Sequence, residues 1–192
     1  MNYMGDSTWW NNRFKNRALN QMKPELCLQE DARTFSPHLK ILDVACGDGR
    51  NALYLAALGH EVSAVDFSEE ALKRLHYFAS QENLHLSTFT ADLSTNFFQV
   101  LKGLSFDVII INHYRLNHKN YGKLITFLNP GGILWVNGFQ EVPLDNPDIK
   151  PSDLILDSDF TTLKSLCELT DQKAYTLNDR QFVRYIWTKP MV

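Results

Sequence analysis

The stretch from Ile41 to Leu58, ILDVACGDGRNALYLAAL, constrains the fold of this chain more than any other. It begins with a short apolar run typical of a buried strand, and it ends with apolar residues at helical spacing. Between the two, Gly47 and Gly49 permit a tight turn and let a ligand approach the main chain. This order predicts a ligand site at the carboxyl end of a parallel strand. A tight turn without a ligand is the alternative.

Alternation of strands and helices continues after this stretch and predicts a parallel sheet. We expect strands at 40–44, 61–65, 84–89, 106–111 and 133–136, with helices at 51–58, after a Ser68 cap, at 121–128 and at 160–169. The residues 129–132, NPGG, predict a turn. Two closing strands, 174–177 and 182–188, flank a short turn and predict an antiparallel hairpin. The predicted fold class is a single doubly wound, Rossmann-like α/β domain with helices on both faces of the sheet.

Composition excludes several function classes. The 192 residues fit one domain, and a formal net charge of -3 disfavours nucleic acid as a partner. No apolar stretch approaches the roughly 18–20 residues that span a bilayer, and the first residues do not resemble a signal peptide. Three distant cysteines indicate neither a disulfide framework nor a zinc site, and His113 with His118 lacks further ligands, so no metal is expected. We therefore expect a cytoplasmic protein without a membrane partner.

Acidic residues at the ends of the expected strands indicate what kind of ligand binds. Residues 47–52 match a dinucleotide fingerprint, but Asp43 and Asp48 place negative charge where a pyrophosphate would lie. S-adenosylmethionine fits better, because it has an ammonium and a sulfonium and no phosphate. Asp66 ends the second strand and is suited to ribose hydroxyls, although it could simply cap a helix. Asp92, after the third strand, is suited to the adenine amine, although such a residue is often only part of a loop.

Several motifs together resemble the class I S-adenosylmethionine-dependent methyltransferases. The resemblance rests on LDVACGDGRNALYLA, VSAVDFS, ADL, FDVIII and LNPGGILWV. GRNALYLAALGHEV and the early aromatic segment WWNNRF look most similar to the small bacterial tellurite-resistance-type and thiopurine-type enzymes. The resemblance implies a seven-stranded sheet with a reversed last strand and S-adenosylmethionine as the cofactor.

The same resemblance implies the residues of the site. Asn112 and His113 would lie near the transferable methyl group. His113 and Tyr114 are our candidates for contact with the methyl acceptor, in the catalytic role, although a single histidine after a strand is more often structural. The cofactor-binding residues that it implies, together with Arg13 for the cofactor carboxylate, are Asp43, Ala45, Gly47, Gly49, Asn51, Asp66, Phe67, Asp92, Leu93 and Asn112. Ala45 stands where the family usually has glycine. No NPPY-like motif and no Pro-Cys dipeptide is present, which disfavours methylation of nucleic-acid bases.

Two segments are predicted to border the substrate. Residues 1–36 are expected to form a helical lid segment before a methyltransferase domain at 37–192, with Trp9, Trp10 and Phe14 either closing over the pocket or packing on the sheet. Arg13 could equally be a solvated surface residue. Residues 140–158 contain three prolines and form either a substrate lid or a disordered crossing.

Three functions remain compatible with the sequence. The first is a methyltransferase that acts on a small-molecule acceptor by in-line transfer, for which placement of the reacting groups supplies most of the acceleration. The second is a non-catalytic module that binds S-adenosylmethionine. The third is a nicotinamide-dependent oxidoreductase, which the acids around the glycines disfavour.

Overall fold

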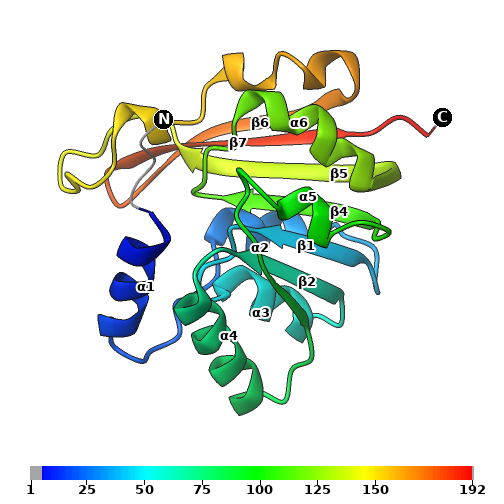
Figure 1. Cartoon of the computed structure of the whole chain (residues 1–192). Coiled ribbons are helices and arrows are strands. Elements are labelled where there is room, and N and C mark those ends of the chain that lie inside the picture. Colours follow the sequence, from blue (N-terminus) through cyan, green and yellow to red (C-terminus); the bar gives the residue numbers. More distant parts are fainter. Residues whose placement is uncertain (1–5, 192) are drawn as a thin grey trace. The chain divides into compact units, whose positions relative to one another are not determined.

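The computed structural model describes residues 6–191 (Figure 1), and its strands form one sheet. β7 runs antiparallel to its neighbours β5 and β6, whereas β1 pairs with β2, β2 with β3, and β4 with β5 in parallel. This sheet confirms the predicted fold class. The order of the seven strands is β3 (Ser87–Thr90), β2 (Glu61–Asp66), β1 (Lys40–Val44), β4 (Phe106–Asn112), β5 (Leu128–Phe139), β7 (Arg180–Thr188) and β6 (Glu168–Leu177).

The described residues divide into two compact units, one ending at Lys102 and one beginning at Gly103. Each unit is described by itself below. The predicted boundary between residues 36 and 37 does not coincide with this division and stays a prediction. The first five residues of the predicted lid segment lie outside the described residues.

The first unit holds β1, β2 and β3 with five helices. Four of the five residues of β1 are buried, as expected for a parallel strand covered on both faces. β1 and β2 are in register from Lys40 opposite Glu61 to Val44 opposite Val65, so both strands end at the same edge. The helices are α1 (Ser7–Asn16), α2 (Leu26–Ala32), α3 (Arg50–Ala57), α4 (Glu69–Gln81) and α5 (Phe97–Val100).

The ends of α3 and α4 follow from local sequence signals. Ser68 caps α4, because its hydroxyl oxygen accepts a hydrogen bond from the backbone N–H of Ala71 at 3.2 Å. Glu69 and Glu70 occupy the first turn, where the helix dipole favours acids. α3 stops before Gly59, whose φ of +87° ends the helix as predicted.

The second unit holds the remaining four strands. A hairpin joins β6 to β7 through Asn178 and Asp179, whose φ angles of 50° and 60° are the left-handed values that a tight two-residue hairpin turn requires. This confirms the predicted hairpin, with both strands longer than expected. The helices of this unit are α6 (His118–Leu124) and the 3-10 turns η1 (Ile125–Phe127), η2 (Pro151–Asp153), η3 (Asp157–Phe160) and η4 (Leu163–Ser165).

Four predicted elements differ from the structure. The third strand, expected at 84–89, begins only at Ser87. In place of the helix expected at 121–128, the structure has α6 followed by the 3-10 turn η1. The turn expected at 129–132 is instead a bulged part of β5, where Gly131 donates its N–H to the Lys189 carbonyl. Gly132 leaves the room that this bulge needs, since a Cβ there would lie 2.8 Å from the Asn129 carbonyl oxygen.

The prediction of a long helix at 160–169 is also wrong. The segment forms the 3-10 turns η3 and η4 and then enters β6 at Glu168. Phe160 and Leu163 are fully buried, and the Phe160 ring packs against Tyr185 and Trp187 of β7. Apolar spacing in this segment therefore reflects two anchors on the sheet rather than a continuous helical face.

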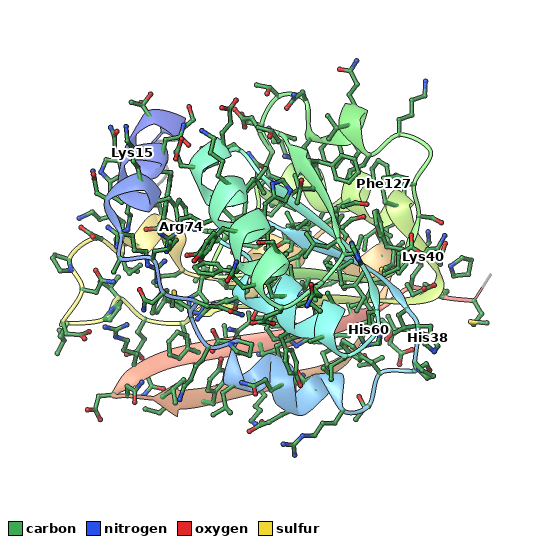
Figure 2. All side chains as sticks on the ribbon, turned by 90° about the horizontal axis from the view of Figure 1, so that it is seen from below. Lys15, His38, Lys40, His60, Arg74 and Phe127 are labelled. Atoms are coloured by element: carbon green, nitrogen blue, oxygen red, sulfur yellow. The ribbon has the colours of Figure 1, made fainter. Side chains whose placement is uncertain are left out.

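A histidine pair at the start of β1 and β2 gives the stability of this unit a pH dependence. The buried His60 accepts the Leu39 N–H at Nδ1 (3.2 Å), and Figure 2 shows His38 close to it. Burial lowers the pKa of His60, and His38 lowers it further. Between this lowered pKa and about 6.5, the unfolded chain binds more protons than the folded one, so stability is lost as pH falls through that interval.

We therefore expect His60→Asn to reduce the loss of stability between pH 7.5 and pH 5.5. Asparagine offers an oxygen that can accept the Leu39 N–H, but it does not titrate. Urea unfolding at the two pH values measures the difference. An unchanged difference in the variant would show that His60 is not responsible.

Candidate functional site

Residues 45–49, which join β1 to α3 and are called the glycine turn below, have an unusual backbone. Ala45, Gly47 and Gly49 all adopt left-handed φ angles, of 56°, 57° and 83°. Gly49 is the N-cap of α3 and donates its N–H to the Cys46 carbonyl at 3.0 Å. A Cβ at Gly49 would lie only 2.1 Å from Leu75 Cδ1, so the close packing of the turn on α4 requires glycine there.

Ala45 is strained, because left-handed φ is unfavourable for a residue with a Cβ. We expect Ala45→Gly to raise the free energy of unfolding by roughly 0.5 kcal/mol, the relief of about 1–2 kcal/mol being partly offset by the greater entropy of glycine in the unfolded chain. Urea denaturation measures this change. A loss of more than about 1 kcal/mol would show instead that the Ala45 methyl group contributes packing that outweighs the strain.

Asp66, at the end of β2, is joined directly to the glycine turn. Its Oδ2 accepts the Gly47 N–H and its Oδ1 accepts the Ser68 N–H, both at 2.8 Å. Burial raises the pKa of Asp66, while these backbone hydrogen bonds act in the opposite direction. Phe67, half-buried, follows it in the chain. The structure therefore brings together two of the residues predicted to hold the cofactor.

Asp43 is buried on β1, and its Oδ2 has no hydrogen-bond partner among the described residues. Burial, with a smaller contribution from Asp66 and against the pull of Arg50, raises the pKa of Asp43 to about 8. At neutral pH this carboxyl group is therefore mostly protonated. A cation placed beside it would favour the charged form and satisfy the unpartnered oxygen.

Asp48 does not provide negative charge for a ligand, contrary to the sequence interpretation. Its Oδ2 lies 3.3 Å from Nε of Arg74 and 3.5 Å from Nη1 of Arg17. Two guanidinium groups thus balance a carboxylate that is itself buried. Of the two acids next to the glycines, Asp43 is left as the one suited to a cation.

Asn51 contacts the segment before α2. It is buried, and its Oδ1 accepts the Glu25 N–H at 2.9 Å. Arg50 forms an ion pair with the Glu25 carboxylate at 2.8 Å. The hydrogen bond to Glu25 gives Asn51 a structural role, and we do not include Asn51 among the proposed cofactor ligands.

Asp92 directly follows a residue that is hydrogen-bonded to Asp66, because Ala91 donates its N–H to the Asp66 carbonyl at 3.0 Å. Its Oδ1 accepts both the N–H and the hydroxyl of Ser94, at 2.7 and 2.6 Å. Asp92 is therefore a turn residue, as the alternative interpretation predicted, with one carboxylate oxygen engaged in the turn. Leu93, beside it, is half-buried.

Helix α1 carries the early aromatic residues. Phe14 is buried, and its ring lies 3.3 Å from the position of a Cβ on Gly47. The Arg13 guanidinium lies over the rings of Trp9 and Trp10, at 5.1 and 5.8 Å from their centroids. Phe14 thus borders the glycine turn, whereas Arg13 is exposed and stacks on aromatic rings.

The other candidates lie in the second unit, at the end of β4. His113 has a φ of 55°, donates its N–H to the Asn137 carbonyl at 2.8 Å, and packs edge-on against Phe139 and Phe182. Asn112 accepts a hydrogen bond from Asn137 Nδ2 at 2.9 Å. Strained backbone of this kind is often found at functional sites. Tyr114, next along the chain, is half-buried.

Residues 140–158 are anchored to their own unit at several points. The Asp145 carboxylate accepts hydrogen bonds from Nε and Nη2 of Arg180, and the Ser152 carbonyl accepts one from Nη1 of Arg115 at 3.3 Å. Ile149 packs in a buried cluster with Phe139 and Phe182. The segment is therefore an ordered border of the cluster that contacts His113, and its role as a substrate lid stays a prediction.

Sequence reasoning missed Arg74 and Asn137, both buried polar residues that organise these segments. Arg74 stands on the apolar stripe of α4, between Ala71 and Phe78, and an arginine on such a stripe is a usable signal. Asn137 interrupts the apolar run of β5 in the same way. Among the residues that the structure describes, no cluster of three potential metal ligands occurs.

Comparison with known proteins adds a family to this geometry. Residues 41–132 match a family model described as a methyltransferase domain. The probable S-adenosyl-L-methionine-dependent methyltransferase TehB of Haemophilus influenzae is 41% identical over 63 residues, 33% of this chain and 22% of that protein. A ubiquinone biosynthesis O-methyltransferase of Bartonella tribocorum is 30% identical over 146 residues, 67% of this chain and 57% of that protein. The matched sequence thus covers about a fifth of the TehB sequence and just over half of the Bartonella tribocorum one.

The crystal structure of TehB from Haemophilus influenzae superposes with a TM-score of 0.66 at 21% identity, over 95% of this chain and 66% of that one. These comparisons confirm the predicted resemblance to the class I S-adenosylmethionine-dependent methyltransferases. Within that class, the chain is similar to the TehB type, as WWNNRF and GRNALYLAALGHEV indicated. In the described part of the chain, no helix has the length and apolar character needed to cross a membrane.

Proposed function

We propose that this chain transfers a methyl group from S-adenosylmethionine to a small-molecule acceptor. The observation that carries the proposal is the buried Asp43 oxygen without a partner, next to an Asp66 carboxylate that holds the glycine turn. The ammonium of the cofactor suits Asp43, and the ribose hydroxyls suit Asp66. When bound, the cofactor supplies an activated methyl group.

The remaining cofactor contacts are assigned by residue chemistry. Ala45, Gly47 and Gly49 expose the main chain of the turn to the methionine part, and Asp92 with Leu93 and Phe67 is assigned to the adenosine part. Arg13 is assigned to the cofactor carboxylate, for which it would exchange its stacking on Trp9 and Trp10.

The remaining assigned residues belong to the second unit: Asn112 is assigned to the cofactor, near its transferable methyl group, and His113 and Tyr114 are assigned to the acceptor. Asn112 and His113 are held by Asn137, and Tyr114 follows them. We propose that His113 and Tyr114 position the acceptor for in-line displacement. A general base is required only for an acceptor that is protonated at working pH.

Calorimetric titration with S-adenosylhomocysteine and, separately, with NAD tests the cofactor. We expect micromolar binding of S-adenosylhomocysteine and no binding of NAD. The reverse result would contradict the proposal and favour a nicotinamide-dependent oxidoreductase. Asp66→Asn is the matched variant, since it keeps the size of the side chain and replaces one hydrogen-bond acceptor by a donor.

Turnover of methyl-labelled S-adenosylmethionine with thiols, tellurite, phenols, purines and protein extracts then tests transfer. We expect label in at least one small molecule, and His113→Asn to lower kcat with an unchanged affinity for S-adenosylhomocysteine. Binding of the cofactor without transfer to any acceptor would favour the non-catalytic module. Transfer to protein extracts alone would contradict the small-molecule acceptor.

A further inference from the structure

Arg74 is a buried charged residue of helix α4. It lies on the side of α4 that also carries the buried residues Ala71, Leu75 and Phe78. Burying a guanidinium is costly unless its N–H groups find partners. Arg74 finds them outside its own helix, in two segments that are separate in sequence.

One partner is the glycine turn, and the others belong to the end of α1. Nε of Arg74 donates to Asp48 Oδ2 at 3.3 Å. Its Nη atoms donate to the carbonyls of Phe14, Arg17 and Ala18, at 3.5, 3.1 and 2.9 Å. Figure 2 shows Arg74 near the end of α1 that carries Lys15. Arg74 therefore donates hydrogen bonds to carbonyls at the C-terminus of α1, where the helix dipole favours a cation.

The same side of α1, one turn earlier, contacts the residues that follow Asp66. Oδ1 of Asn11 accepts the Ser68 hydroxyl at 2.7 Å and the Glu70 N–H at 3.3 Å. Ser68 in turn donates its N–H to Asp66. With Phe14 against Gly47, α1 touches both segments that the Asp66–Gly47 hydrogen bond joins.

We propose that Arg74 is a positioning residue that couples the docking of α1 to the geometry of the glycine turn. This inference rests on the proposed function, because the turn is the assigned cofactor site. We call α1 docked when its last residues accept the Arg74 hydrogen bonds and Phe14 packs against Gly47. In this state Arg74 also holds Asp48, and the glycine turn keeps the conformation that binds the cofactor. By linkage, bound cofactor must favour docked α1 by the same factor.

The chain contains a natural probe of α1 docking, since Arg13, Lys15 and Arg17 are trypsin sites at the end of this helix. Cleavage there requires local opening of α1. The experiment compares the full chain with Arg74→Lys, whose single ammonium cannot reach both segments. Lys73→Ala, on the exposed side of α4, is the matched control. Cleavage at each site is followed by mass spectrometry, with and without S-adenosylhomocysteine.

We expect S-adenosylhomocysteine to slow cleavage at these sites in the unsubstituted chain. Arg74→Lys should speed cleavage at least roughly fivefold and raise the Kd for S-adenosylhomocysteine by a similar factor, while Lys73→Ala changes neither. Unchanged cleavage, or a raised Kd without faster cleavage, would overturn the coupling. Failure of the unsubstituted chain to bind S-adenosylhomocysteine would instead contradict the proposed function.

A second variant keeps the test valid if Arg74→Lys does not fold. Asn11→Ala removes the other anchor of α1 at a partly exposed position and leaves Arg74 in place. We expect faster cleavage at Arg13, Lys15 and Arg17 together with weaker binding of S-adenosylhomocysteine. Faster cleavage with an unchanged Kd would show that α1 and the turn are independent.

Discussion

Gly49→Ala is expected to lower the free energy of unfolding by about 2–5 kcal/mol, combining a left-handed backbone cost of about 1–2 kcal/mol with overpacking of about 1–3 kcal/mol. The φ of +83° accounts for the first cost, and the 2.1 Å approach to Leu75 Cδ1 for the second. Leu75 is fully buried, so it has little room to move away. Urea denaturation of the full chain measures the loss.

Gly59→Ala separates the two causes. Gly59 has nearly the same φ, +87°, but a Cβ there would meet no atom within 4 Å. We therefore expect this exposed variant to lose only the backbone part, about 1–2 kcal/mol. Equal losses in the two variants would show that contact with Leu75 contributes nothing. Gly47→Ala, at 3.3 Å from Phe14, should fall between them.

The affinity for S-adenosylhomocysteine is expected to rise steeply with pH between 5.5 and 7.5. Asp43 is protonated over this range in the empty site, because burial raises its pKa to about 8. An ammonium beside it favours the ionised form, so binding releases a proton. The Kd should then fall by up to about tenfold for each pH unit. Calorimetry in two buffers of different ionisation enthalpy measures both the Kd and the released proton.

Asp43→Asn is the control, since asparagine matches the size and neutrality of protonated Asp43. In this variant we expect Kd to be nearly independent of pH over the same range. A slope as steep as in the unsubstituted chain would exclude Asp43 as the source. The same raised pKa gives the unliganded chain stability that is present below about pH 4 and is lost as pH rises through about 8, and Asp43→Asn should remove that loss.

The sequence predicted what short-range physics determines. β1, the Ser68 cap, the end of α3 at Gly59 and the turn at Asn178 and Asp179 follow from residues within a few positions of each other. The meeting of Gly47 with Asp66 was also predictable, because parallel strands end at one edge of a sheet.

Contacts between distant segments were not predictable. The neutralisation of Asp48 depends on Arg17 and Arg74, which lie 31 and 26 residues away in sequence. The segment 160–169 showed helical spacing, yet packing of Phe160 on β7 determined its conformation. Tertiary packing overrides local preference in such cases.

The backbone hydrogen bonds to Asp66 have a thermodynamic consequence. Oδ2 accepts the Gly47 N–H, Oδ1 accepts the Ser68 N–H, and Phe67 adds a further backbone hydrogen bond to the carboxylate. A carboxylate has about four acceptor sites, so a ligand hydroxyl can still donate to Asp66 without breaking these contacts. The entropy of fixing this side chain is therefore lost during folding and not at the moment of association. Preorganisation of this kind predicts that a nucleoside binds to an Asp66 carboxylate that is already fixed in place. The loops on either side of Asp66 then need no rearrangement when the nucleoside binds.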